Sequence, residues 1–177
     1  MTMLLDRHLH IRAIDAYIDP NVPRERAIIT HGHADHARSG HGAVLATPDT
    51  IAIMKVRYGE DCAGRFEPLD FGVPLRIDDV TITFFPAGHV LGSAQVLVEK
   101  DGQRVVVTGD YKRLPDRTSQ PYELVECDLL VTEATSGCRC SSIPIRRSRS
   151  GGCSNRWPTS RSAATLWAAT RWARRSG

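Results

Sequence analysis

Four side chains that commonly bind metal ions lie within six residues of this chain. Segment 31–36 has the sequence HGHADH and contains His31, His33, Asp35 and His36. Neutral imidazole is the most frequent protein ligand of zinc, and carboxylate is a regular partner. Alternate residues of an extended chain point to one side, so His31 and His33 can reach one metal ion, while Asp35 and His36 on the following turn can reach a second. A polar loop that holds histidines by chance explains this density poorly.

Two more residues of metal-binding type follow apolar runs and stand beside glycines. His89 comes after the run 80–85 (VTITFF), and Asp110 comes after the run 103–108 and Gly109. Glycine lets the backbone turn tightly at such strand ends. A single histidine is more often structural, and an aspartate there can be an exposed turn residue. The repeated placement at strand ends favours a metal ligand in both cases.

The elements that must position these side chains are short strands and a helix. The runs 27–30 (AIIT) and 43–46 (AVLA) predict strands. Thr47 can cap a helix that starts at Pro48, and Gly59 can end it. Apolar residues at helical spacing predict a stripe that packs into the core, at Ile51, Met54 and Tyr58.

Further strands are predicted between residues 80 and 132. They cover 80–85, 94–98, 103–108 and 128–132, and Asp101-Gly102 between the second and third is a strong hairpin signal. Strands interrupted by a helix indicate an α/β sandwich. In such a fold, loops at several strand ends converge at one edge and can bring the ligand-type side chains together.

The composition is that of an ordinary globular chain, with 177 residues, 41% hydrophobic and 24% charged. The start has no long apolar run, so no signal peptide or membrane span is predicted, and the expected location is cytoplasmic. The five cysteines lack disulfide-like spacing and are expected to stay as thiols. Residues 1–135 contain all 20 acidic residues but 14 of the 23 Lys and Arg, so the net charge of +3 comes from the tail and does not indicate nucleic-acid binding.

Residues 14–136 resemble the metallo-β-lactamase half of the β-CASP nucleases. They are most similar to the bacterial ligase-associated DNA exonucleases, often labelled mRNA 3′-end processing factor-like. The motif HGHADH after a strand is the part that resembles the metallo-β-lactamase fold. Three further motifs resemble the β-CASP nucleases in particular: 87–94 (AGHVLGSA), 109–113 (GDYKR) and 132–135 (TEAT). The resemblance implies an α/β metallo-β-lactamase αββα sandwich. This chain is expected to hold its N-terminal half only, as a partial domain over residues 1–135.

The resemblance also implies a site with two zinc ions. One ion would be held by His31, His33 and the more distant His89. The second ion would be held by Asp35 and His36, and Asp110 would bridge the two ions. The two ions would activate a hydroxide for in-line attack on a phosphodiester and neutralise charge on the phosphate, with Asp35 and Asp110 as the catalytic carboxylates.

Supporting residues follow from the same resemblance. An aspartate after an early strand supports the metal-binding loop in these relatives, and Asp19 matches it, although a plain Asp-Pro turn explains Asp19 equally well. Glu133 matches the acidic residue of the first β-CASP motif. Lys112 and Arg113 are candidate phosphate contacts, or else a solvated strand end. No histidine follows Glu133, so the second zinc site is expected to be incomplete and the activity of this chain impaired.

The predicted function is therefore a metal-dependent DNA exonuclease of DNA repair or end processing. Nucleic acid is the expected partner, DNA rather than RNA, together with a DNA ligase or helicase repair system and no membrane. Two alternatives stay open. The first is a small-ester or thioester hydrolase of the same fold, which would turn over a chromogenic thioester. The second is a non-catalytic fragment that binds metal without turnover.

The composition breaks at about Ser136. Residues 136–177 hold all three Trp and nine Arg but no Asp, Glu or Lys. If ~18% of residues are normally of those three types, such a gap has a chance on the order of 10⁻⁴. No apolar periodicity remains, so no packed structure is expected. Back-translation shifted by one base yields three segments that resemble these exonucleases, and we predict that the tail is translated out of frame. A genuine Arg-rich binding tail is the alternative.

Overall fold

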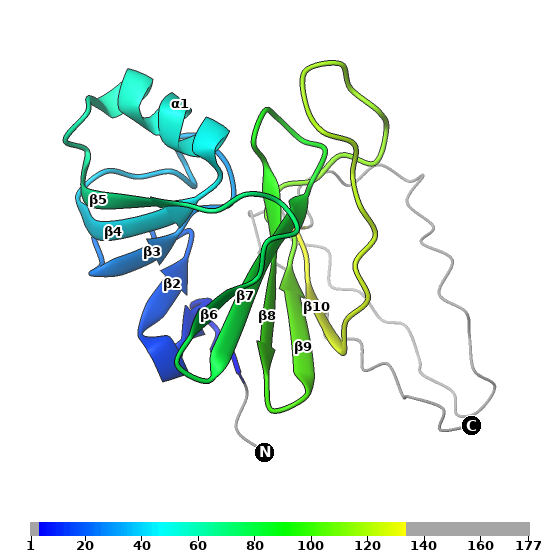
Figure 1. Cartoon of the computed structure of the whole chain (residues 1–177). Helices are drawn as coiled ribbons and strands as arrows, with labels where there is room; N and C mark the ends of the chain where they lie inside the picture. The colour runs from blue at the N-terminus through cyan, green and yellow to red at the C-terminus, as the bar shows by residue number, and fades with distance from the viewer. Residues whose placement is uncertain (1–3, 134–177) are drawn as a thin grey trace, which may run out of the picture.

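The computed structural model describes residues 4–133, which form two five-stranded sheets and one α-helix (Figure 1). The strands of the first sheet follow chain order: β1 (His10–Ile11), β2 (Ala16–Ile18), β3 (Arg26–Ile28), β4 (His41–Ala46) and β5 (Ala63–Pro68). The β1–β2 pair is antiparallel and includes the short 3-10 helix η1 (Arg12–Ile14) in its connection. The remaining pairs are parallel, and helix α1 (Pro48–Tyr58) connects β4 to β5.

The second sheet is mostly antiparallel. Its order is β10 (Leu129–Val131), β9 (Gln103–Val107), β8 (Ala94–Lys100), β7 (Val80–Pro86) and β6 (Leu75–Ile77), and only β10 runs parallel to its neighbour. The predicted hairpin is confirmed between β8 and β9. Asp101 and Gly102 both have positive φ, 51° and 74°, as a two-residue turn between twisted strands requires.

The main core lies between the two sheets. Side chains alternate along a strand, so Ile28 of β3 and Leu45 of β4 point from the first sheet toward the second. From the second sheet they meet Phe84 of β7, Val96 of β8 and Val105 of β9. Phe84 is completely buried and is among the largest buried side chains. This apolar layer joins the sheets into the predicted sandwich.

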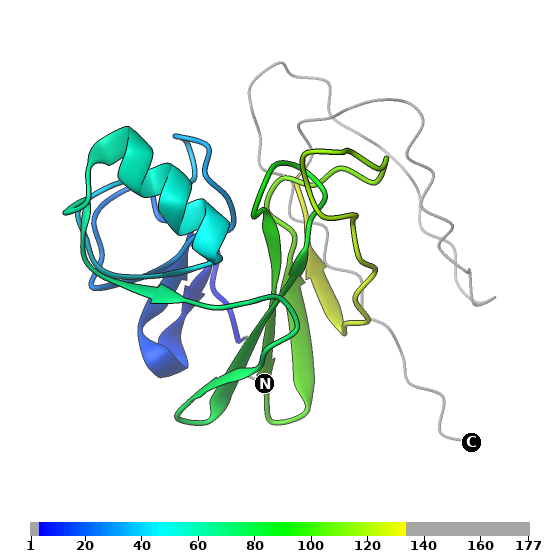
Figure 2. The same ribbon diagram turned by 45° about the horizontal axis from the view of Figure 1, so that its top comes forward.

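A smaller core lies on the other face of the first sheet. Val44 and Ala46 of β4 point there and pack with Ile51 and Met54 of α1. Helix α1 therefore covers the outer side of the first sheet (Figure 2). The result is three layers, one helix and two sheets. Residues 4–133 form no second helical layer, so the described part supplies the first three layers of the αββα arrangement.

The predicted helix is confirmed at both ends. Thr47 is the N-cap and its side chain accepts from the backbone N–H of Thr50, Pro48 is the first residue, and Gly59 follows with φ +95°. The prediction that Tyr58 is core was wrong, because 36% of it is exposed. Tyr58 is the last residue of α1 and borders an open pocket instead of the sheet.

Two further predictions concern the ends of the chain and membranes. Within residues 4–133, no helix is long and apolar enough to cross a membrane. The segment 136–177, predicted to be out of frame, lies outside the described residues.

Candidate metal centre

Three loops that follow strands contribute the candidate ligands. His31 and His33 come after β3, His89 lies between β7 and β8, and Asp110 comes after β9. The loops after β7 and β9 emerge at the same edge of the second sheet (upper edge in Figure 1). Within the described residues, one group of metal-binding type stands out. Its four ligand atoms, one from each of these side chains, all lie within 4.8 Å of one another.

The three imidazoles of this group converge through their nitrogens. Nδ1 of His33 lies 3.0 Å from Nε2 of His31 and 3.2 Å from Nε2 of His89. A tetrahedral zinc ion with Zn–N bonds of about 2.0–2.1 Å would separate its ligand nitrogens by roughly 3.3 Å. The three rings also stand nearly perpendicular to one another, with interplanar angles of 81–86°. The donor set therefore fits a zinc ion of nitrogen-rich coordination.

One carboxylate oxygen of Asp110 faces this first group, and the other faces a second group formed by His36 and Asp35. Its Oδ2 lies 3.6 Å from Nε2 of His89 and 3.9 Å from Nε2 of His31, whereas its Oδ1 lies 3.5 Å from Nε2 of His36. Burial raises the pKa of Asp110, Glu133 and Asp35 add to the rise, and His36 and His89 oppose it. A carboxylate in this position can be shared by two metal ions.

The second group is smaller and more open. His36 and Asp35 lie on the turn after His33, where the backbone N–H of His36 donates to the His33 carbonyl over 3.1 Å. Nε2 of His36 is 3.8 Å from Oδ2 of Asp35, whose side chain is 75% exposed. Together with Asp110, these residues offer three ligand atoms. The structure thus brings all six predicted ligands to one place, with the first group the more compact.

Asp19 lies directly behind both groups. It accepts three hydrogen bonds: Oδ1 from the backbone N–H of Thr30 (2.8 Å), and Oδ2 from the Thr30 hydroxyl (2.6 Å) and from Nδ1 of His36 (2.8 Å). Of the two alternatives for Asp19 on the sequence, these contacts favour support of the metal-binding loop over a plain turn. Thr30 was not predicted as a site residue, because a threonine before a histidine carries no signal of its own.

The same contacts assign the tautomers of two histidines. The Thr30 hydroxyl gives its proton to Asp19, so its oxygen accepts from Nδ1 of His31 at 3.1 Å. Nδ1 of His36 likewise donates to Asp19. In the neutral form of both rings Nε2 then keeps its lone pair, which a metal ligand needs.

The ionisation of these two rings differs. Burial, together with the charges of His36, His33 and His89, lowers the pKa of His31 to about 2, so its ring is neutral, as a metal ligand would have to be. Burial alone would lower the pKa of His36, but the hydrogen bond and charge of Asp19, with Asp110 and Asp35, raise it to about 8. Without metal, His36 holds a proton that a metal ion would replace.

The remaining predicted residues lie around Asp110. Lys112 turns its ammonium to Asp116, 2.6 Å away, and its backbone N–H donates to the Ala87 carbonyl. The ammonium is thereby engaged by Asp116, while Arg113 is exposed. Glu133 accepts from the backbone N–H of Tyr111 over 3.2 Å, directly beside the Asp110 loop.

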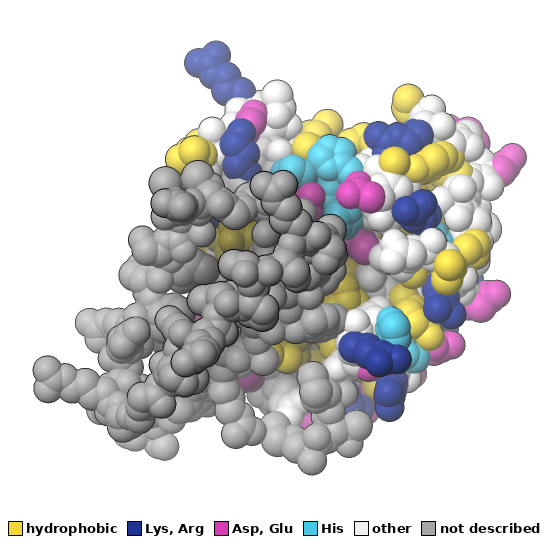
Figure 3. Space-filling model, turned by 180° about the vertical axis from the view of Figure 1, so that it is seen from behind, with side chains coloured by type: hydrophobic (Ala, Val, Ile, Leu, Met, Phe, Trp, Pro, Cys, Tyr) yellow, Lys and Arg dark blue, Asp and Glu magenta, His cyan; other side chains and the backbone are white. Residues whose placement is uncertain are grey.

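The centre opens onto the surface. Seen from behind, one group of histidine side chains near the upper middle has acidic side chains next to it (Figure 3). In the metal centre His31 is completely buried, whereas 26% of the His89 side chain and 25% of the Asp110 side chain are exposed. A ligand larger than a metal ion can therefore reach the centre from outside.

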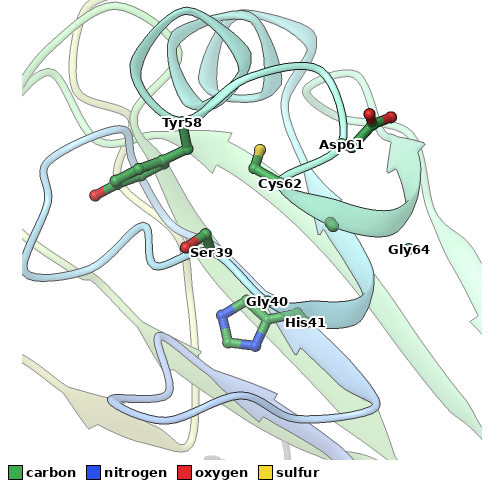
Figure 4. A pocket seen from close by; sticks show the side chains of 8 residues that line it. Ser39, Gly40, His41, Tyr58, Asp61, Cys62 and Gly64 are labelled. Carbon is green, nitrogen blue, oxygen red and sulfur yellow. The ribbon is translucent and has the colours of Figure 1, made fainter.

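A separate pocket of about 420 Å³ lies at the amino ends of β4 and β5, away from the metal centre (Figure 4). His41, Cys62 and Tyr58 are among its lining residues. Nδ1 of His41 accepts from the backbone N–H of Arg24, and its buried Nε2 has no hydrogen-bond partner within the described residues. None of the predicted site residues lines this pocket.

Comparison with known proteins identifies the family. The model of the Beta-lactamase superfamily domain matches residues 16–174. The chain is 32% identical over 132 residues to a protein of Opitutus terrae named "Probable DNA ligase", covering 73% of this chain and 13% of that protein. It is 31% identical over 184 residues to the endoribonuclease YSH1 of Gibberella zeae, covering 81% and 22%.

A third relative is a ribonuclease of Thermus thermophilus, 30% identical over 144 residues, with 65% of this chain and 32% of that protein covered. The chain thus spans between about an eighth and a third of the length of these curated relatives. Relatives named as nucleases agree with the predicted β-CASP resemblance. With the family model matched over most of its length, the chain belongs to the metallo-β-lactamase superfamily.

Proposed function

We propose that this chain carries the metal centre of a phosphodiester hydrolase that acts on nucleic acid. The observation that carries the proposal is the position of Asp110, with one oxygen toward His31 and His89 and the other toward His36. Two adjacent groups that share one carboxylate suit a pair of metal ions, and paired ions are a recurrent solution for phosphodiester cleavage. The named nuclease relatives support the same reaction.

Zinc is the proposed metal, because nitrogen-rich tetrahedral sets favour it. His31, His33 and His89 would hold the first ion, Asp35 and His36 the second, and Asp110 both. When bound, the pair supplies an activated water and charge neutralisation at the phosphate. Thr30 and Asp19 accept hydrogen bonds from Nδ1 of His31 and of His36. In each neutral ring this leaves Nε2 unprotonated and directed at the centre.

DNA is the proposed substrate, cleaved from an end, in a repair setting in the cytoplasm. The relative named as a DNA ligase supports DNA, and a ligase is the proposed partner activity. The ribonuclease relatives make RNA the necessary comparison. Arg113, exposed beyond the Asp110 loop, is the proposed phosphate contact, since Lys112 is already paired with Asp116.

The test compares end-labelled DNA and RNA of one sequence. The purified protein is stripped with a chelator, reloaded with zinc or manganese, and assayed for release of labelled nucleotide. We expect metal-dependent cleavage that is weak, because the second site is expected to lack a ligand, and that is lost in Asp110→Asn and retained in Asp70→Asn, an exposed aspartate outside both groups. Metal content is measured in parallel on every variant.

Three outcomes would contradict the proposal. Absence of bound metal after reloading would exclude the centre itself. Turnover of a chromogenic thioester without cleavage of either nucleic acid would indicate a small-ester hydrolase. Stoichiometric metal with no turnover of any substrate would identify a metal-binding fragment, and preferential cleavage of RNA would correct the substrate alone.

A further inference from the structure

The first turn of α1 holds the loop that carries His89. The hydroxyls of Thr47 and Thr50 both donate to the carbonyl of Gly92, over 2.7 and 3.1 Å, and both threonines are buried. Two donors satisfy both lone pairs of that oxygen. Gly92 has φ +74°, and a Cβ there would lie 2.6 Å from Cβ of Asp49, so its backbone rests directly on the helix.

The last turn of α1 holds the loop that carries the other two histidines. Nη1 of Arg57 donates to the carbonyl of Gly32, which lies between His31 and His33. A Cβ at Gly32 would lie 2.6 Å from Cγ2 of Ile53, so this backbone also rests on the helix. The two ends of one helix therefore hold two loops that are far apart in the sequence.

Hydrogen bonds within the loop connect Gly92 to the backbone of His89. Ser93, the next residue, accepts with its hydroxyl from the backbone N–H groups of His89 and Val90, over 3.0 and 3.2 Å. The segment from His89 to Ser93 is thus closed by its own hydrogen bonds. A shift of the Gly92 carbonyl must move the His89 backbone with it.

We propose that α1 sets the separation of the metal ligands, with Thr50 and Arg57 as positioning residues. Neither side chain is a predicted ligand, yet each holds a loop that carries one, Thr50 through Gly92 and Arg57 through Gly32. The imidazole nitrogens of His33 and His89, 3.2 Å apart, belong to those two loops, so their spacing depends on the helix between them. This inference rests on the metal centre proposed above.

The test measures Zn²⁺ affinity of the 177-residue protein by competition with a chromophoric chelator, and the absorption spectrum of the Co²⁺ form. Thr50→Val and Arg57→Gln should each weaken Zn²⁺ binding by about tenfold, as loss of a residue that supports a ligand does, and should change the Co²⁺ spectrum. Thr50→Ser keeps the hydroxyl and should bind as the unaltered protein does.

Matched controls separate positioning from stability. Thr83→Val removes a buried threonine hydroxyl from β7, and Arg65→Gln removes an exposed guanidinium from β5. Both should leave affinity and spectrum unchanged. If Thr50→Val does not fold, Arg57→Gln decides alone, because its side chain is exposed.

Two results would overturn the inference. One is unchanged affinity and spectrum in both Thr50→Val and Arg57→Gln, which would make their contacts structural only. The other is an equal loss in the control variants. If the unaltered protein binds no metal at all, the proposed function fails first, so the two failures are distinguishable.

Discussion

Asp19→Asn tests the hydrogen-bond logic of the centre without changing the size of the side chain. Asparagine keeps one acceptor oxygen but replaces the other by an amide that donates. The oxygen can still accept from the backbone N–H of Thr30, 2.8 Å from Oδ1. The amide then stands where Oδ2 accepts from the Thr30 hydroxyl and from His36, at 2.6 and 2.8 Å. Both partners must become acceptors.

The consequence reaches a ligand atom in each group. The ring proton of His36 moves from Nδ1 to Nε2, and the Thr30 hydroxyl turns its proton to Nδ1 of His31, which also becomes protonated on Nε2. Those two Nε2 atoms face Asp110, at 3.5 and 3.9 Å, and each would carry a hydrogen instead of a lone pair. One substitution therefore blocks both metal groups.

The magnitude follows from the bonds that must be undone. A hydrogen bond to a charged group contributes about 1.5–3 kcal/mol, which corresponds to roughly 10- to 100-fold in metal affinity. Zn²⁺ binding should weaken by about that factor at each group. Above pH 8, where His36 is neutral, the metal-free protein keeps its number of hydrogen bonds, so its free energy of unfolding in urea should change there by only about 1 kcal/mol.

Asp15→Asn is the matched control. Asp15 also has a positive φ, 48° against 45° for Asp19, and it lies 2.8 Å from Nε2 of His10, but its side chain is exposed and outside the centre. Its substitution should leave Zn²⁺ affinity unchanged. If Asp19→Asn bound Zn²⁺ within twofold of the unaltered protein, the tautomer assignment would be wrong.

Three further predictions concern the core, pH and the tail. Phe84→Ala should lower the free energy of unfolding by about 3–5 kcal/mol in urea titrations, because Phe84 is fully buried between the sheets, and Leu124→Ala, 85% exposed, should change it by less than about 0.5 kcal/mol; equal effects would contradict the described core. Although burial alone lowers the pKa of His36, its carboxylate partners raise it to about 8 from 6.5, so its contribution to metal-free stability is complete below 6.5 and disappears as pH rises through 8. Unfolding free energy should therefore fall between about pH 7 and pH 9, and a flat profile would argue against the ion pair with Asp19. Sequencing of the gene should show an open alternative frame after codon 136, and stop codons there would exclude a frameshift.

Local rules were enough to predict several elements. Thr47, Pro48 and Gly59 mark the ends of α1 through contacts within a few residues, and the cap on Thr50 N–H is present. Asp101-Gly102 predicted its hairpin because the turn demands positive φ at both residues. The types of the candidate metal ligands were also predictable, since HGHADH places four of them within six residues.

The partners of single residues were visible only in the tertiary structure. Asp19 was equally compatible with a turn until its partners, Thr30 and His36, were brought against it from 11 and 17 residues away. Asp110 was predicted as a carboxylate shared by two ions, and the sandwich adds the geometry, with its two oxygens toward two groups from other strands.

The hydrogen bonds from α1 to both histidine loops could not be predicted from the sequence either. No sequence pattern links Thr50 to Gly92, and the fold places them in contact although they are 42 residues apart. Residue type determines which groups can donate, accept or bind metal. Which partner each group meets depends on distances between segments remote in the chain, and packing of the two sheets and the helix sets those distances.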